Sequence, residues 1–400
     1  MDGKRRNPPS ITELPGWQEN VYSLPLTESS SNYAADRQLS RNEPLAKYPH
    51  PFPLTPPMGK KSETEANPFE DDHFCGDPTS LNHSERLASE MAYTDEAPLE
   101  FPIASAEVSI VIVNYNSGTY LSRCLTSCAA QSAEVIIVDN ASTDSSLALA
   151  QSTAPDGIEL KIIRNDTNVG FSRACNQGVA LARGNYLLFL NPDCVIEKHA
   201  VGWLLQAVDA PDIGMVGGLL LNPDGTEQAG GRRAVPTPWR TFVRAFGLQG
   251  LAQRYPRLFD DFLLHQTPLP SEVIDVEAIS GACMLVPRHA FDKIGPLDEG
   301  YFMHCEDLDW CMRFRIGGLR VSFQPRARVL HYKGRCSVNH PFAVEWHKHR
   351  GMVRFYKKFF RHQYPGVLMM TVSLGIWLRC SAVFCYLLIR RPWTQHDENQ

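Results

Sequence analysis

Short apolar runs alternate with helical patterns from position 108 onward, and this alternation constrains the fold more than any other feature. The runs are Val108–Val113, Val135–Val138, Leu160–Ile163 and Tyr186–Leu190. Each is almost continuously apolar, which is typical of strands in a parallel sheet that helices cover on both faces. The sequence therefore predicts an α/β domain with a parallel sheet flanked by helices on both faces.

Polar residues stand where these strands end and in the loops that follow. In open α/β sheets, ligands bind outside the carboxyl ends of the strands. Short amides and carboxylates suit a nucleobase or ribose, because they offer paired donors and acceptors. For Asp139 and Asn168, turn or helix-cap chemistry explains the residue equally well. The candidate nucleotide-binding residues are Asn114, Asn116, Asp139, Asn140, Asn168, Gly170 and Asn176.

Several classes of function are excluded or disfavoured. The chain has no P-loop and no Gly-x-Gly-x-x-Gly after the first strand, which argues against an ATP or dinucleotide cradle. A net charge of −5 with a pI near 6.2 gives no sign of nucleic-acid binding. The 11 cysteines lack the spacing of a zinc site, and no signal peptide is evident, so reduced thiols in the cytoplasm are expected.

The turn Asn191-Pro-Asp193 is a candidate metal site. It places a carboxylate in a fixed turn at the mouth of the sheet, where it can hold a divalent cation and leave other positions free for phosphate oxygens. Such a metal needs a second protein ligand, and His331 is the candidate because it ends an apolar strand beside Lys333. The alternative is an ordinary satisfied or solvent-facing histidine.

Three carboxylates crowd onto a segment that otherwise predicts a buried amphipathic helix. At about 100° per residue, Glu306, Asp309 and Arg313 fall on one polar face, whereas Asp307 lies on the apolar side with Phe314. Asp307 is either a helix-start residue favoured by the macrodipole or a general base in a cleft. Glu306, its neighbour, is the second candidate catalytic residue, through acceptor contacts or helix capping.

The two ends of the chain differ from this central part. Residues 1–103 are rich in proline and lack apolar periodicity, so we expect a disordered arm, or alternatively a small β-rich accessory domain. A basic helical extension is expected over 341–364 and a hydrophobic, membrane-associated helix over 365–391. Arg379 disfavours a membrane crossing, so an interfacial helix or a buried core helix remains possible.

Six ordered motifs together resemble the family-2 type of GT-A glycosyltransferases. The similarity covers about residues 106–340, within an expected catalytic domain of residues 104–340. Asn191-Pro-Asp193, together with Asn222–Arg232, is most similar to rhamnosyltransferase-like members. The motifs are Val108–Ser117, Val138–Asp144, Asn168–Gly178, Leu190–Asp193, Ile279–Met284 and Phe302–Asp307.

The resemblance implies a GT-A fold, that is, an α/β domain with a Rossmann-like, mixed and mainly parallel sheet flanked by helices. It also implies a nucleotide-sugar donor, a divalent cation (Mg²⁺ or Mn²⁺) and inversion at the anomeric carbon. It places Asp139 at the nucleobase and Asp193 at the metal and diphosphate. Asp307 becomes the general base, and His331 corresponds to the metal or diphosphate histidine. Asn-Pro-Asp stands where the family has Asp-x-Asp.

We therefore expect an inverting glycosyltransferase that moves a sugar to a hydroxyl of a glycan or lipid-linked acceptor at the cytoplasmic face of a membrane. Rhamnose is a candidate sugar, with dTDP-rhamnose as the first donor to test. One alternative is a nucleotidyltransferase, which usually has a Gly-rich basic loop where this chain has Asn114–Tyr120. The other is a nucleotide-sugar-binding or catalytically inactive scaffold, against which the intact Asp193 and Asp307 argue.

Overall fold

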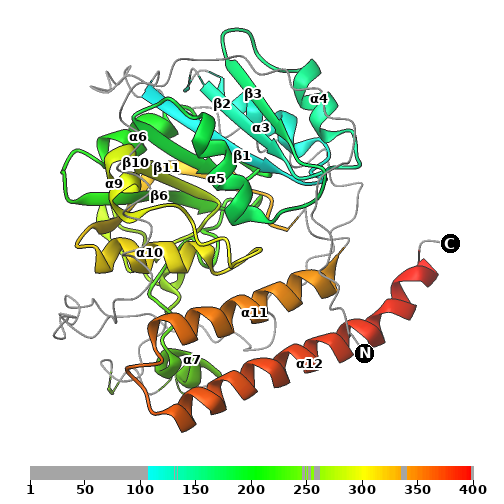
Figure 1. Ribbon diagram of the computed structural model, residues 1–400, viewed down its shortest axis with the longest axis vertical. Helices are drawn as coiled ribbons and strands as arrows, with labels where there is room; N and C mark the ends of the chain where they lie inside the picture. Colours follow the sequence, from blue (N-terminus) through cyan, green and yellow to red (C-terminus); the bar gives the residue numbers. More distant parts are fainter. Residues whose placement is uncertain are drawn as a thin grey trace, which may run out of the picture. The chain divides into compact units, whose positions relative to one another are not determined.

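The computed structural model describes residues 107–397, apart from 130, 133, 246, 247, 249, 251–253, 256–261 and 335–339. The arm expected over residues 1–103 lies outside the described residues. The described part is a sheet with helices on both faces, followed by two long helices (Figure 1).

The nine-stranded sheet has the order β3-β2-β1-β4-β10-β6-β11-β5, with β8 also pairing β11. The strands expected from the sequence form its parallel half, β3-β2-β1-β4, and β10 runs antiparallel between β4 and β6. The mixed α/β architecture predicted from the sequence is thus confirmed. The bounds are β1 Val108–Asn114, β2 Glu134–Asp139, β3 Glu159–Arg164, β4 Tyr186–Leu190, β5 Cys194–Ile196, β6 Ile213–Leu221, β8 Ile274–Asp275, β10 Cys283–Pro287 and β11 Arg320–His331. A separate ribbon pairs β7 (Arg232–Arg233) with β9 (Ala278–Ile279).

Alternating side chains of the buried strands divide the core into two layers. Ile110 and Ile112 of β1 pack in the layer of α3, α4 and α6, whereas Val111 and Val113 pack in the layer of α5, α9 and α10. This alternation explains why the strands are apolar throughout, since both faces are covered. The helices are α3 Tyr120–Cys128, α4 Ser146–Ser152, α5 Phe171–Leu181, α6 Ala200–Gln206, α7 Pro238–Ala245, α9 Arg288–Ile294 and α10 Glu306–Ile316, with a short 3-10 turn η4 at Leu264–Gln266.

Two long helices complete the described chain: α11 (Pro341–Phe359) and α12 (Gly366–Asp397). Phe355 of α11 and Ile376 of α12 are buried in the same apolar layer as α10. Residues Gly366–Ile389 are long and apolar enough to cross a membrane, judged by length and composition only. Figure 1 shows α11 and α12 lying alongside each other beyond α10.

Candidate active site

The ends of β1 and β2 form a hydrogen-bonded edge. Asn114 lies opposite Asp139 in the strand register, is fully buried, and donates from Nδ2 to Asp139 Oδ1 over 2.7 Å. The other carboxylate oxygen of Asp139 accepts from the Ser142 backbone N–H at 3.1 Å. In the adjoining loop, Asn116 Oδ1 accepts from the Thr143 N–H at 2.8 Å. The structure therefore brings these candidates together, with Asn114 bracing Asp139.

The next candidates surround the start of α5. Asn140 Nδ2 donates to the Gly170 carbonyl at 3.3 Å, and Asn168 Oδ1 accepts from the Gly170 N–H at 3.0 Å. Gly170 has a φ of +88°, and a Cβ there would stand 2.7 Å from the Phe302 carbonyl oxygen. That same oxygen accepts from Phe171 N at 2.7 Å. Gly170 is thus required by the close approach of the loop that carries Phe302.

Asn176 lies apart from this edge. Its side-chain oxygen accepts from the Leu297 N–H and its Nδ2 donates to the Leu297 carbonyl, both at 3.0 Å. The same Nδ2 also lies 3.1 Å from a Glu299 carboxylate oxygen. The amide thus fastens α5 to the loop before α10 and does not join the other candidates at the edge of β1 and β2.

The two candidate metal ligands lie close together beside β5, at the opposite side of the sheet from β3. Asp193 lies in the turn between β4 and β5, and His331 ends β11 directly opposite Cys194. His331 Nε2 is 3.3 Å from Asp193 Oδ1, and both side chains are buried. One ligand atom each from Asp193, Cys194 and His331 lies within 4.8 Å of the others. The thiol of Cys194 donates to the Ala282 carbonyl at 3.6 Å.

Gln228 fixes the tautomer of His331, and the sequence argument missed this residue. Its Nε2 donates to Asn222 Oδ1 at 2.9 Å, so its Oε1 accepts from His331 Nδ1 at 2.7 Å. In the neutral imidazole, Nε2 then turns a lone pair toward the Asp193 carboxylate. Two acceptors this close need a proton or a cation between them. The oxygen and nitrogen donors fit a divalent cation such as Mg²⁺ or Mn²⁺.

The three acids at the start of α10 are enclosed by the protein. Glu306, Asp307 and Asp309 are all buried, and Asp309 is fully inaccessible. Asp309 bonds to Arg313 one turn later at 2.9 Å, and Lys358 of α11 approaches its other oxygen at 2.6 Å. The polar face that the helix projection gives is covered by α11, and this contact joins segments distant in sequence.

The two adjacent acids of α10 have different surroundings. Asp307 Oδ2 accepts from Arg233 Nη2 at 2.5 Å and from the Gly281 N–H at 3.1 Å. Glu306 Oε2 has no hydrogen-bond partner among the described residues. Burial, with the Asp307 charge beside it, raises the pKa of Glu306 to about 8. Glu306 is thus neutral at pH 7, whereas the Asp307 carboxylate accepts from three donors, the third being the Leu308 N–H, which lies 2.7 Å from Oδ1. Arg233, in the two-residue strand β7, is a site residue that no motif identified.

A single dipeptide joins the acid of α10 to the metal candidates. Gly281 donates its N–H to Asp307, and the next residue, Ala282, accepts from the Asn191 N–H at 3.0 Å. Asn191 begins the turn that carries Asp193. The segment that enters β10 therefore lies between Asp307 and the turn that carries Asp193.

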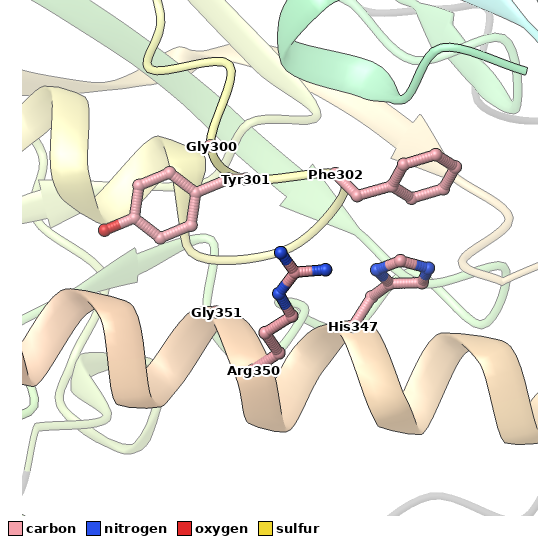
Figure 2. Close-up of a pocket in the computed structure, with 6 residues that line it drawn as sticks. All are labelled: Gly300, Tyr301, Phe302, His347, Arg350 and Gly351. Atoms are coloured by element: carbon pink, nitrogen blue, oxygen red, sulfur yellow. The ribbon is translucent and has the colours of Figure 1, made fainter. Parts of the chain in front are cut away.

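The loop before α10 has an unusual backbone and encloses little space. His304 and Cys305 both have positive φ, 64° and 69°, which is costly for two consecutive non-glycine residues and marks functional loops. Figure 2 shows Arg350 and His347 of α11 pointing toward this loop, near Phe302. The cavity between them has a volume of about 10 Å³, enough for one water molecule and too small for a sugar.

A larger hollow of about 440 Å³ lies elsewhere, and Asp209, Asp275 and Arg320 are among its lining residues. Arg320 begins β11, whereas His331 ends it. This hollow therefore lies at the far end of the strand from the candidate metal ligands and is not part of the site.

Residues 109–294 match the model of glycosyl transferase family 2. This part of the chain is a family 2 glycosyltransferase domain. The matched region contains the strand-end residues, Asp193, Gln228 and Arg233, whereas α10 and His331 follow it in the sequence.

Rhamnosyltransferases are among the proteins to which this domain is similar, and the domain is rhamnosyltransferase-like. The N-acetylglucosaminyl-diphospho-decaprenol L-rhamnosyltransferase of Mycobacterium tuberculosis is 28% identical, over 58% of this chain and 78% of the relative. The low-salt glycan biosynthesis hexosyltransferase Agl10 of Haloferax volcanii is 27% identical, over 54% and 64%. Rhamnosyltransferase WbbL of Escherichia coli is 26% identical, over 38% and 53%. Among solved structures, a mannosyltransferase from Pyrobaculum calidifontis in complex with GDP-Man and Mn²⁺ is 15% identical, with a TM-score of 0.45, over 75% of this chain and 78% of that one.

Proposed function

We propose that this protein is an inverting, metal-assisted glycosyltransferase that uses Asp307 as its general base. The observation that carries the proposal is the dipeptide Gly281–Ala282, which contacts Asp307 on one side and the turn of Asp193 on the other. An in-line displacement needs the base and the metal on opposite sides of the reacting carbon, because the attacking hydroxyl and the leaving diphosphate stand on opposite faces of the sugar.

Asp307 would take the proton of the acceptor hydroxyl while the oxygen of that hydroxyl forms a bond to the anomeric carbon. The bond from that carbon to the nucleoside diphosphate breaks in the same step, with inversion. A positioned base contributes on the order of 10²–10⁴ in rate. The bonds from Arg233 and Gly281 orient the Asp307 carboxylate, so that little reorganisation is needed when the acceptor binds.

Glu306 would have a different role from Asp307. Because its pKa is raised to about 8, it is protonated at pH 7 and can donate a hydrogen bond but not accept a proton. We therefore assign Glu306 to positioning of the acceptor or of Asp307, and the base function to Asp307 alone.

Asp193 and His331 would hold the divalent cation, with Gln228 orienting the histidine ring. When bound, such a cation neutralises charge on a departing diphosphate. On the edge formed by β1 and β2, Asp139 would face the nucleobase, with Asn114 behind it. Asn116, Asn140, Asn168 and Gly170 would shape that edge, and Asn176 would act from a distance by fastening the loop of Leu297.

The sugar and acceptor are proposed from the relatives. A rhamnosyl donor, with dTDP-rhamnose first, is supported by the rhamnosyltransferase names, and a lipid-linked saccharide acceptor by the diphospho-decaprenol name. The disordered arm (1–103), catalytic domain (104–340), basic extension (341–364) and hydrophobic helix (365–391) remain our proposed division of the chain. The hydrophobic helix would keep the enzyme at the cytoplasmic face of a membrane.

The test is turnover with a donor found by screening nucleotide-sugars, comparing Asp307→Asn with Glu306→Gln. Asp307→Asn keeps size and hydrogen bonding but cannot accept a proton, so turnover should fall by about 10² or more while donor affinity survives. Glu306→Gln should fall less, because Gln still donates. Near-normal turnover of Asp307→Asn, or greater damage in Glu306→Gln, would overturn the assignment. Failure of the unaltered chain to transfer any sugar would favour a nucleotidyltransferase or a binding scaffold.

A further inference from the structure

Helix α12 is apolar on two faces, and only one of them is covered. Its inner face, formed by Met369, Val372, Ile376 and Cys380, is buried or half-buried. Its outer face carries large apolar side chains that are 57–77% exposed. A soluble helix has polar residues on its open face, so this outer face needs an occupant. The outer face consists of Val367, Met370, Leu374, Leu378, Leu388 and Ile389.

Helix α11 occupies the inner face along much of α12, in the antiparallel direction. The rings of Trp346 and Trp377 lie 5.0 Å apart, and those of Phe342 and Phe384 lie 5.3 Å apart. Burial lowers the pKa of His349 in α11, and the charge of Arg379 lowers it further, which places Arg379 beside α11. The only charged side chain between 366 and 389 is thus turned toward α11.

This packing is incompatible with α12 crossing a bilayer. The span Gly366–Ile389 is about 36 Å long at about 1.5 Å per residue, so length alone would allow a crossing. However, α11 would then have to enter the hydrocarbon with α12, and each charged residue costs about 2.5–3.5 kcal/mol at the centre of a membrane helix. The charged residues of α11 are Glu345, Lys348, Arg350, Arg354, Lys357 and Lys358.

Helix α11 is also fixed to the glycosyltransferase domain. Lys358 Nζ lies 2.6 Å from Asp309 Oδ2 of α10 and 2.8 Å from Asp298 Oδ2. Arg354 Nη2 lies 2.8 Å from the other oxygen of Asp298. The pair α11–α12 is therefore attached to the helix that bears Asp307.

We infer that α12 lies flat on a bilayer that contains anionic lipid, with its outer face in the interface and α11 between it and the catalytic domain. Charge complementarity selects this occupant. The exposed basic residues Lys357 and Arg361 stand just before the start of α12 in the chain, and basic residues beside an apolar helix bind anionic headgroups. The inference rests on the proposed membrane location and adds the orientation.

The first arm of the test measures whether the full chain binds membranes. It should sediment with phosphatidylcholine vesicles that contain phosphatidylglycerol and much less with pure phosphatidylcholine. Lys357→Ser and Arg361→Ser should each weaken binding by about fivefold, whereas Lys198→Ser, an exposed lysine beside α6, should not. No binding to either vesicle, or dimerisation through α12 instead, would overturn both the membrane location and this inference.

The second arm tests orientation alone. Nitroxide labels at Met370→Cys, Leu374→Cys and Leu378→Cys, in a chain whose Cys75, Cys336 and Cys385 are changed to serine, report depth by their access to oxygen and to a water-soluble nickel complex. A flat helix gives one shallow depth of about 5–10 Å for all three. A label at Val372→Cys, on the inner face, should gain no lipid access. Depths that change by about 1.5 Å per residue, or lipid access at 372, would show a crossing helix and overturn the inference while leaving membrane binding intact.

Discussion

At the scale of single residues, the strongest argument for a cation is the facing pair of acceptors at Asp193 and His331. His331 Nδ1 donates to Gln228, so Nε2 presents a lone pair to Asp193 Oδ1 at 3.3 Å. Two acceptors at this distance repel each other unless a cation or a proton lies between them. Cys194 is close, but its thiol is directed to a carbonyl. Hard cations prefer oxygen and nitrogen ligands to thiols, which agrees with Mg²⁺ or Mn²⁺.

We predict that Asp193→Ala abolishes metal-dependent donor binding, because the diphosphate would lose its bridge to the protein. Calorimetry of the nucleotide-sugar with and without Mn²⁺ measures this. Gln228→Leu should weaken Mn²⁺ binding about 10–100-fold without removing a ligand, because the imidazole loses its orientation. Asp224→Ala, an exposed acid in the nearby turn, is the control. Unchanged affinity and metal dependence in Asp193→Ala would rule out the metal assignment.

Glu306 gives a pH prediction. Its pKa is about 8 in the folded protein and about 4.3 in the unfolded chain, so the folded state binds more protons between these values. Stability therefore falls as the pH rises through this window, by up to about 1.4 kcal/mol per pH unit. Glu306→Gln should flatten the dependence of the urea midpoint between pH 5 and pH 8, and the exposed Glu272→Gln should not. Parallel curves for the unaltered chain and Glu306→Gln would contradict the buried, protonated state.

At the scale of elements, α10 shows what a sequence pattern can and cannot predict. The helix and the adjacency of Glu306 and Asp307 follow from local sequence, and so do the strands β1 to β4, because apolar runs and polar stops are local signals. The partners of α10 do not. Arg233 comes from 74 residues upstream and Lys358 from 49 residues downstream of their acids, and no periodicity encodes such contacts. The burial of the polar face of α10 by α11 is a distant contact of the same kind.

Substitution of Lys358 tests whether its ion pair with Asp309 holds α11 against α10. Lys358→Met keeps the apolar stem but leaves the fully buried Asp309 with Arg313 as its remaining cation. We predict a loss of about 1–3 kcal/mol in the free energy of unfolding, reduced from the value for a fully buried pair because the lysine is one-third exposed. Urea titration measures it, with the exposed Lys357→Met as the matched control. An equal effect of the two substitutions would mean that the ion pair does not fasten the helix.

At the scale of the whole molecule, the described residues form one large sheet with an apolar layer on each face. The sheet begins at Val108, and the buried apolar residues of its two layers lie between Val108 and Cys380. The α/β architecture could be predicted because each strand and helix carries its own pattern. The packing of α12 on α11 could not, because an apolar helix fits a membrane, an interface or a core equally well in sequence.

Deletion of residues 1–100 is therefore predicted to leave the catalytic domain folded and nearly as active on a soluble acceptor. The physical reason is that the proline-rich segment lacks the apolar periodicity needed to add a strand or helix to this core. Thermal unfolding and turnover of the truncated chain, measured beside the full chain, check the prediction. Membrane binding through α12 should also survive, since that helix lies at the other end of the sequence. A truncated protein without a cooperative thermal transition would show that the first hundred residues complete the fold.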